Sequence, residues 1–430
     1  MKFKLLFALM AFAAATASAQ STIVITNGQA TINYTNKHFT GVSTLQGKAG
    51  KKWVGLQNFF TTERIGTKTL TLPANATNYT EFRVRALSVA PGNAFANLAA
   101  SYGNIHTVAG SNAVPIGVNG WQPEFEGALA TAVNLSNPRQ AVANTNGDIY
   151  VVEKDRHTVS VIVKATGRIH TIWGTNGPGS GPDFGLNPKT NALNKPSALW
   201  LNGSFLYVLD SGNNRVRVLS LLANQVRTLV SDASGITNGS SLWVSPDELE
   251  VYYTDGTMLK HWTQDVGIPI VNPATFINLA AVVIDRSGDV GIADRGDNRI
   301  LQVDDVGLKS SVAGSGFPSG FNSGGQRFRV ALPGASSIAF MPTGGFLVGL
   351  DQPDSKFGAR VWYIDGDNLA APLVYGQPGI HQGDEGWFRA GARRPKIGTI
   401  QSVSVAPSGD IIMVEGNQYI RTIDFLRLKP

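Results

Sequence analysis

Cysteine is absent from the 430-residue chain, so no disulfide framework holds its fold. Charged residues are also scarce, at 15% against about 25% in an average soluble domain, which excludes a highly charged disordered chain. The 48 glycines and 21 prolines are too few for collagen or a low-complexity chain but unfavourable for a helical bundle. Together these proportions predict an all-β protein that is stabilised by a large buried core.

Long hydrophobic runs are missing as well. No stretch approaches the roughly 18 apolar residues that a membrane-spanning helix needs, so we expect no membrane span. The longest apolar run, residues 5–15, follows Lys2 and Lys4 and precedes the small residues at 17–19. This arrangement is typical of a secretory signal peptide. We therefore predict a signal peptide at residues 1–19 and a mature protein that is secreted and extracellular, or periplasmic in a bacterium.

The chain has no large excess of charge of one sign. It contains 36 basic and 30 acidic residues, and loss of Lys2 and Lys4 with the signal peptide leaves 34 against 30, a net charge of +4. A balance this mild does not predict nucleic-acid binding. Only six histidines are present, and their placement does not predict a metal site. The partners we expect are extracellular glycans or proteins, with no nucleic acid.

A repeated unit extends from about residue 105 to the end of the chain. One copy has short strands at residues 196–201, 205–210 and 215–219, and a second copy at residues 281–303 matches it position by position. Six copies can be aligned by an acid that ends the second strand, at a mean spacing of about 52 residues. This is the size of a four-stranded propeller blade with generous loops. The aligned acids are Glu153, Asp210, Asp255, Asp294, Asp351 and Glu415.

One strand of the repeat lies out of order. Residues 105–110 match the fourth strand of a unit but precede the first unit, whereas no fourth strand follows the last unit. We expect this strand to complete the last blade, which leaves no open sheet edge where the chain ends meet. The sequence therefore predicts a six-bladed β-propeller over residues 104–430, closed by an N-terminal strand.

The unit resembles the repeat of the NHL family of six-bladed β-propellers. Residues 210–216 and 294–300 match the family's turn between the second and third strands, and residues 105–110 and 169–174 match its terminal strand. The resemblance covers about 325 residues, and residues 153–158 and 351–354 depart from the pattern. It implies the same closed ring.

Residues 20–103 lack this unit but alternate apolar and polar side chains as strands do, at residues 22–25, 30–34, 68–73 and 81–87. We predict a small β domain of the β-sandwich type. Residues 70–90 weakly resemble the later strands of a fibronectin type III domain, although Tyr79 is one residue out of register for that family's buried tyrosine. The simpler alternative is a β cap on the propeller.

The six aligned acids are interpreted as structural. Each precedes a turn rich in glycine and asparagine, where a carboxylate accepts backbone N–H bonds. Arg215 and Arg299 recur with the scaffold, so they are interpreted as hydrogen-bond donors between blades rather than as ligand contacts.

Catalysis by this architecture is the alternative to binding. Propellers of similar architecture that act as lactonases or lyases place acids, Asn or His where the innermost strands begin. This sequence offers no acid or His at those positions, which disfavours an enzyme; we assign no catalytic or metal-binding residue. A calcium-assisted hydrolase or lyase would need calcium, whereas a binding protein needs no cofactor. The residues at those positions are Arg139, Gln140, Ser197, Ser240, Ala280, Ser336 and Gln401.

Long loops point to a binding face. Connections from a fourth strand to the next first strand emerge together on one face of a propeller, and four are long, at residues 111–136, 175–194, 315–332 and 377–399. Aromatic side chains beside cations suit an acidic glycan or peptide. The candidate ligand-binding residues are Trp121, Arg327, Arg329, Trp387, Arg389, Arg393, Arg394 and Lys396.

Three functions are therefore open. The first hypothesis is a secreted, noncatalytic propeller that binds a glycan or a protein through this loop face. The calcium-assisted enzyme is the second, and a structural matrix or adhesion protein is the third. The structural alternative is that the loop aromatics form small cores of their own and the loop cations are only solvated.

Overall fold

The computed structural model describes residues 19–26, 28–36, 41–50, 52–61, 65–72, 79–87, 102–285, 288–319, 325–341, 345–352, 359–365, 368–375, 385–387 and 397–425. The chain divides into two compact units. One comprises residues 1–102 with 341–345 and 425–430, and the other comprises residues 103–340 and 346–424. Apart from Ala19, the residues predicted to form the signal peptide lie outside the described part.

The first unit contains two antiparallel sheets of three strands each. One sheet has the order β1-β2-β5 and the other β4-β3-β6. Buried side chains of β2, β3 and β5, including Ile32, Leu45 and Leu70, form a core shared by both sheets. This arrangement is a small β-sandwich. The strands are β1 (Ala19–Thr26), β2 (Gln29–Asn36), β3 (Gly41–Ala49), β4 (Lys52–Thr61), β5 (Ile65–Thr71) and β6 (Phe82–Leu87).

The second unit contains six antiparallel sheets, each of which forms one blade. The residues alternate sides of each strand, and nearly all the side chains of the second strands are buried, as expected for sheets covered on both faces. In chain order, the inner strands of blades 1 to 6 are β8 (Pro138–Ala143), β13 (Pro196–Asn202), β17 (Gly239–Val244), β21 (Leu279–Ile284), β26 (Ala335–Phe340) and β31 (Ile400–Val405).

The remaining strands extend outward from the inner ones. The second strands are β9 (Ile149–Glu153), β14 (Phe205–Asp210), β18 (Glu250–Asp255), β22 (Val290–Asp294), β27 (Phe346–Leu350) and β32 (Ile411–Glu415). The third strands are β10 (Thr158–Val163), β15 (Arg215–Ser220), β19 (Met258–Thr263), β23 (Arg299–Val303), β28 (Ala359–Ile364) and β33 (Tyr419–Phe425). The fourth strands are β11 (Arg168–Trp173), β16 (Gln225–Ser231), β20 (Ile270–Val271), β24 (Lys309–Ala313), β29 (Leu369–Tyr375) and β7 (Tyr102–Ala109).

Some of the long connections add short segments outside this plan. A fifth, outermost strand is present in blades 2, 5 and 6, as β12 (Phe184–Gly185), β25 (Gly325–Gln326) and β30 (Glu385–Trp387). Short 3₁₀ turns are η2 (Pro123–Phe125), η3 (Ala130–Ala132), η4 (Pro188–Thr190) and η5 (Ser211–Asn213).

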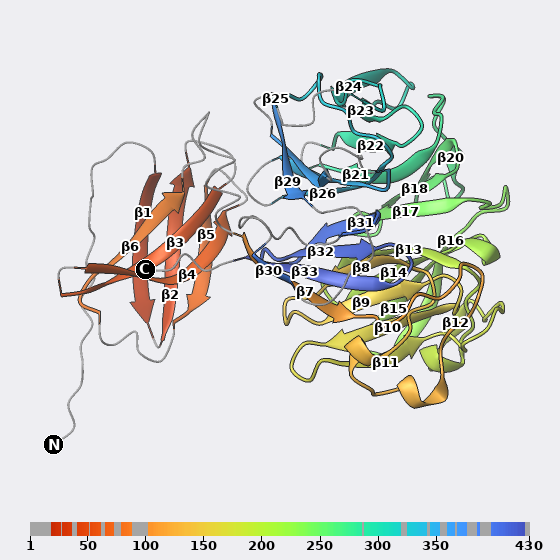
Figure 1. Ribbon diagram of the computed structural model, residues 1–430, viewed down its shortest axis with the longest axis horizontal. Coiled ribbons are helices and arrows are strands. Elements are labelled where there is room, and N and C mark those ends of the chain that lie inside the picture. The colour runs from red at the N-terminus through yellow and green to blue at the C-terminus, as the bar shows by residue number, and fades with distance from the viewer. Residues whose placement is uncertain are drawn as a thin grey trace. The chain divides into compact units, whose positions relative to one another are not determined.

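The six inner strands form a closed ring. Each contacts the inner strands of the two neighbouring blades, and β31 contacts β8. Buried side chains fill the space between adjacent blades, for example Val152, Leu199 and Val208 between blades 1 and 2. The unit is therefore a six-bladed β-propeller, as the sequence predicts (Figure 1).

The closing strand is also confirmed. The sheet of blade 6 has the order β30-β7-β33-β32-β31, so β7 lies between β33 and β30 (Figure 1, orange beside blue). His106 of β7 forms a hydrogen bond of 2.8 Å with Asp424 of β33. The strand that precedes blade 1 in the sequence therefore completes blade 6. Among the described residues, no helix has the length and hydropathy to cross a bilayer.

Candidate functional site

The carboxylates that mark the repeat brace the connections leading to the inner strands. Glu153 accepts the backbone N–H of Ser136 at 2.9 Å, and Asp210 accepts that of Asn194 at 2.7 Å. Asp294 accepts the N–H groups of Ile277 and Asn278 at 3.0 and 2.9 Å. Asp255 and Glu415 make equivalent bonds to the segments before β17 and β31. In each of these blades a buried acid at the end of the second strand fixes the start of the first.

Most blades also bury a cation beneath their long connection. Arg217 of β15 donates to Asn191 Oδ1 at 2.6 Å and to the Pro182 carbonyl. Lys260 of β19 pairs with Asp232 and Asp255 at 2.7 and 3.3 Å. Arg421 of β33 occupies the corresponding place in blade 6, and Arg156 is the buried cation of blade 1. In blade 5 the corresponding residue of β28 is Trp362, and the buried Arg360 donates to the Ile397 carbonyl in the connection before β31. These cations hold the loops by hydrogen bonds that the loops could not make among themselves.

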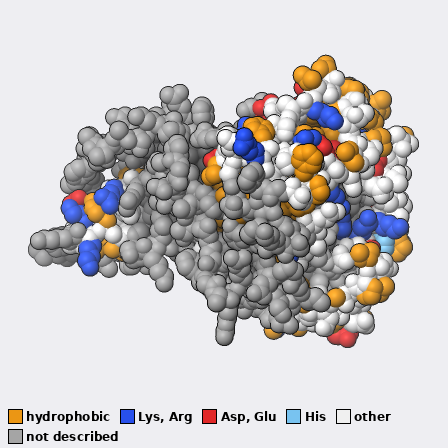
Figure 2. Space-filling view, turned by 45° about the horizontal axis from the view of Figure 1, so that its top comes forward, with side chains coloured by type: hydrophobic (Ala, Val, Ile, Leu, Met, Phe, Trp, Pro, Cys, Tyr) orange, Lys and Arg blue, Asp and Glu red, His pale blue; other side chains and the backbone are white. Residues whose placement is uncertain are grey.

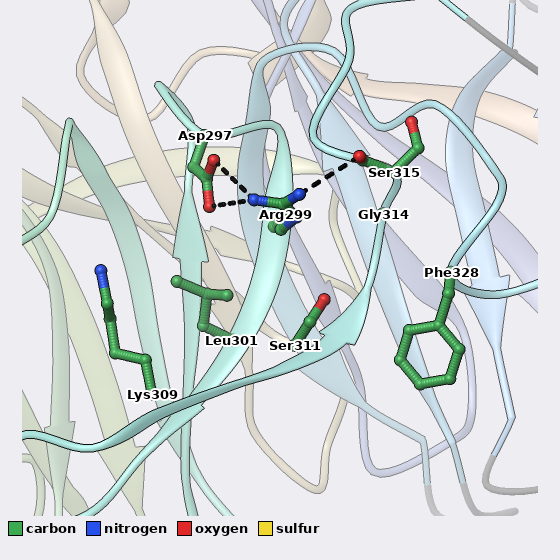
Figure 3. Close-up of a pocket in the computed structure, with 8 residues that line it drawn as sticks. All are labelled: Asp297, Arg299, Leu301, Lys309, Ser311, Gly314, Ser315 and Phe328. Atoms are coloured by element: carbon green, nitrogen blue, oxygen red, sulfur yellow. Dashed lines mark hydrogen bonds and ion pairs between the residues drawn. The ribbon is translucent and has the colours of Figure 1, made fainter.

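Blade 4 departs from this pattern. The third residue of β23 is Leu301, where β15 has Arg217 and β19 has Lys260. A pocket of about 420 Å³ lies there, a volume within the usual range for small-molecule sites. Its walls come from the turn before β23, from β23 and β24, and from the connection after β24. The lining residues are Asp297, Arg299, Leu301, Lys309, Ser311, Gly314, Ser315 and Phe328 (Figure 3).

The pocket combines one exposed ring with neutralised polar groups. Arg299 donates to both carboxylate oxygens of Asp297 at 3.0 and 3.1 Å and to the Ser315 carbonyl at 3.3 Å. Phe328, which is 44% exposed, stands at the opposite side from Lys309, with Leu301 and Ser311 between them (Figure 3). The site offers hydrogen-bonding groups and an apolar platform, together with the ammonium of Lys309, which donates to the Thr275 carbonyl at 2.6 Å.

Gly316 keeps this arrangement open. Its φ of +81° lies in the left-handed region, and a Cβ there would collide with the Arg299 guanidinium. A larger residue would therefore push Arg299 away from Ser315.

Two of the residues predicted from the sequence lie beside this pocket. Arg327 and Arg329 flank Phe328 in the chain, and the Arg327 guanidinium is 4.8 Å from the centre of the Phe328 ring. Arg327 is half-buried, whereas Arg329 is exposed. The pocket residues on β23 and β24 were missed by the sequence analysis, although the replacement of the usual third-strand cation by Leu301 could have indicated them.

Trp121 is used by the protein's own packing. Its side chain is only 9% exposed, the Arg156 guanidinium lies 3.3 Å from its ring centre, and Phe125 packs edge-on against it. The ring belongs to the core between blades 6 and 1, so the protein's own side chains occupy the space that a ligand would need. No sequence pattern distinguishes such a loop core from a binding platform.

Of the remaining predicted residues, the structure describes only the backbone of Trp387. Trp387 ends β30, opposite Asn104 of β7, and its side chain lies outside the description. Arg389, Arg393, Arg394 and Lys396 lie outside the described residues.

The inner strands share a second feature, a β-bulge at the same place in all six. Pairing with the second strand skips one residue near the start of each inner strand, or two in β17. A bulge turns the unpaired side chain out of the ladder. We call these residues the bulge ring: Arg139, Ser197, Ser240 with Ser241, Ala280, Ser336 and Gln401.

The bulge ring links neighbouring blades at the start of the central channel. Arg139 donates to Gln401 Oε1 at 3.1 Å, Ser240 donates to the Ala280 carbonyl at 3.1 Å, and Ser336 donates to the Ile400 carbonyl at 2.6 Å. Apart from Ser241, these are residues that the sequence analysis expected where inner strands begin. Gln140, which was also expected there, is paired in the ladder and accepts the Leu199 N–H at 2.9 Å.

Among the described residues, no group of three or more His, Cys, Asp or Glu side chains is arranged to hold a metal ion. Exposed hydrophobic side chains of the propeller appear in small groups separated by polar and charged ones (Figure 2). Phe317 and Phe328, at 67% and 44% exposure, both belong to the connection after β24.

No family model matches this chain, and no curated protein matches it in sequence. Solved structures of the same fold exist. A Bacteroides thetaiotaomicron protein of unknown function has a TM-score of 0.58 at 12% identity, over 94% of this chain and 97% of its own. An auxiliary nutrient binding protein from the same species has a TM-score of 0.54 at 11% identity, over 92% and 94%. Another from Bacteroides ovatus has 0.53 at 13%, over 92% and 94%. At these identities the likeness establishes the fold.

Proposed function

We propose that this protein is a secreted, noncatalytic β-propeller that binds an extracellular glycan through its loop face, with the blade 4 pocket as the central contact. The carrying observation is Phe328, an exposed ring beside the Asp297–Arg299 pair and Ser311. The flat apolar face of a sugar packs on an aromatic ring while its hydroxyls bond to paired polar groups, and both elements are present here.

Two further observations support this proposal. The sequence units resemble NHL repeats, and two solved structures of the same fold are auxiliary nutrient binding proteins of Bacteroides species. A nutrient glycan is therefore the ligand class with which to begin. Signal-peptide features at residues 1–19 agree with a protein that meets such a ligand outside the cytoplasm.

Binding of the mature chain, residues 20–430, to a glycan array tests the proposal, and calorimetry with the best glycan then gives the affinity. We expect Phe328→Ala to weaken this affinity about fivefold to tenfold, the loss that one aromatic platform explains. Phe205→Ala is the matched control, because Phe205 is 41% exposed at the start of β14 in another blade, outside the long connections of this face. It should bind as the wild type does.

Other outcomes distinguish the alternatives. Equal affinities of the two variants would show that the pocket is not part of the binding site. Conversion of a bound glycan or lactone into product would indicate the enzyme. Failure with every glycan, combined with saturable binding of an extracellular protein or with self-association, would favour a protein ligand or a matrix role.

A further inference from the structure

The channel mouth, meaning the bulge ring with the residues that directly follow the repeat acids, carries a concentration of cations. Arg139 is the bulge residue of blade 1. Lys154 follows Glu153 in the same blade, and Arg295 follows Asp294 in blade 4. The corresponding residue of blade 2, Ser211, lies against the bulge residue Ser197 at 2.6 Å. The residues that follow the acids therefore lie beside the bulge residues, at the same opening.

These cations come from opposite blades of the ring. Blade 4 is opposite blade 1 in the closed ring of six, yet the positive charge of Arg295, together with the larger effect of burial, lowers the pKa of Arg139. Burial and the charges of Arg139 and Lys195 lower the pKa of Lys154. Arg295 also has its pKa lowered by burial. Lys154 and Arg295 donate their backbone N–H groups to the carbonyls of Asn137 and Asn278 at 3.1 and 2.8 Å, directly before β8 and β21. Both therefore lie where an inner strand begins, as Arg139 does, at the same end of the central channel.

The nearby carboxylates do not balance them. Asp155 is engaged by the Gly117 N–H at 2.6 Å and by Asn137 at 2.9 Å, and Asp351 pairs with Arg295. Among the described residues, four cations against two carboxylates leave an excess of two positive charges. Arg139 makes its side-chain hydrogen bond to neutral Gln401, and within the described residues the Lys154 ammonium has no ion-pair partner. Arg139, Lys154 and Arg295 all remain partly exposed to solvent.

We propose that the channel mouth is an oxyanion-binding site, in which Arg139 and Lys154 hold a carboxylate or sulfate group from one side of the opening and Arg295 faces it from the other. A guanidinium and an ammonium supply several charge-assisted donors. The bulge presents Arg139 away from its strand, and the ring of Ser and Gln side chains supplies further donors around the anion. The site is separate from the blade 4 pocket, so it does not depend on that pocket binding a glycan.

Calorimetric titration of the mature chain in low salt with sodium glucuronate, sodium sulfate and glucose tests this site. Glucuronate or sulfate should bind, glucose should not, and the comparison of the two anions identifies the preferred oxyanion. Raising the salt concentration tenfold should weaken binding, because these charges remain partly exposed. Failure of both anions to bind the wild type would overturn the proposal.

Matched variants locate the binding. Arg139→Gln and Lys154→Gln should each weaken binding of the preferred anion at least tenfold. Lys154→Gln should fold as the wild type does, because the Lys154 side chain makes no hydrogen bond among the described residues. Lys164→Gln, in the exposed turn between β10 and β11, removes the same charge elsewhere and should have no effect. Phe328→Ala should also bind the anion normally. Wild-type affinity in both mouth variants would refute the assignment.

Discussion

Asp210 illustrates how one residue serves the scaffold at a cost. It is fully buried at the end of β14, and burial raises its pKa from 3.8 to about 6, although hydrogen bonds from Asn194 and Asn213 and the charges of Arg217 and Arg215 act in the opposite direction. Between these two pH values the unfolded chain has lost the proton and the folded protein retains it. Stability therefore falls as pH rises from about 4 to 6, and the cost is complete above pH 6.

Replacing Asp210 with Asn should remove this dependence. A shift of this size corresponds to about 3 kcal/mol, so the stability of Asp210→Asn relative to the wild type should rise by about this amount between pH 4 and 7. Urea unfolding at a series of pH values measures it. Asp305→Asn, at an exposed position, is the control and should follow the wild-type curve. Parallel curves for Asp210→Asn and wild type would contradict the raised pKa.

Arg217 shows the same principle for a buried cation. It is fully buried, and its bonds to Asn191 and Pro182 hold the connection before β13. We predict that Arg217→Met lowers the free energy of unfolding by about 3–5 kcal/mol, because the acceptors on Asn191 and Pro182 are left buried without their donor and Asp210 loses a nearby positive charge. Denaturant unfolding gives the value. Arg215→Met, two residues away on the same strand and partly exposed, should lose about 1 kcal/mol or less; equal losses would show that burial is not the deciding factor.

At the scale of elements, regular alternation made most strands predictable. The second strands of all six blades were located, because each is an apolar run before a turn. Five of them end in the predicted acid, whereas β27 ends at Leu350, one residue before Asp351. Two strands of the first unit, β3 and β4, were not predicted. Glycines at 41, 47 and 55 and a register shift after Leu45 interrupt their alternation, so periodicity of two does not persist along them. The outer strands β12, β25 and β30 are also too short to carry a pattern.

The element with the largest predicted effect is β7. A chain that begins at residue 102 should retain a folded propeller, whereas one that begins at residue 111 should aggregate, because β33 is then left as an unpaired edge. Size-exclusion chromatography and thermal unfolding of the two truncated proteins make the comparison. Equal melting temperatures and elution volumes would mean that closure by β7 is dispensable.

At the scale of the molecule, the ring is held together without covalent links. Side chains of the inner strands bridge neighbouring blades, as in the bonds of Ser404 to the Ala141 carbonyl at 2.7 Å and of the Val403 N–H to Ser337 at 3.0 Å. The repeat made this architecture predictable from the sequence. The cations of the channel mouth could not be recognised as a group from the sequence, because Arg139 and Lys154 belong to blade 1 and Arg295 to blade 4, and these blades share one opening only when the ring closes.

Closure by β7 also has a kinetic consequence. The residues joined by the bond between His106 and Asp424 are 318 positions apart, and bringing such distant segments together costs about 5 kcal/mol in chain entropy. During synthesis β7 emerges before every blade, yet its partner β33 is made last. Capture of the first propeller strand is therefore a late event, and folding is slow for a chain of this length because it awaits such non-local pairing. Until that moment the nascent protein carries two unsatisfied edges, and this interval is when it most needs protection from other chains.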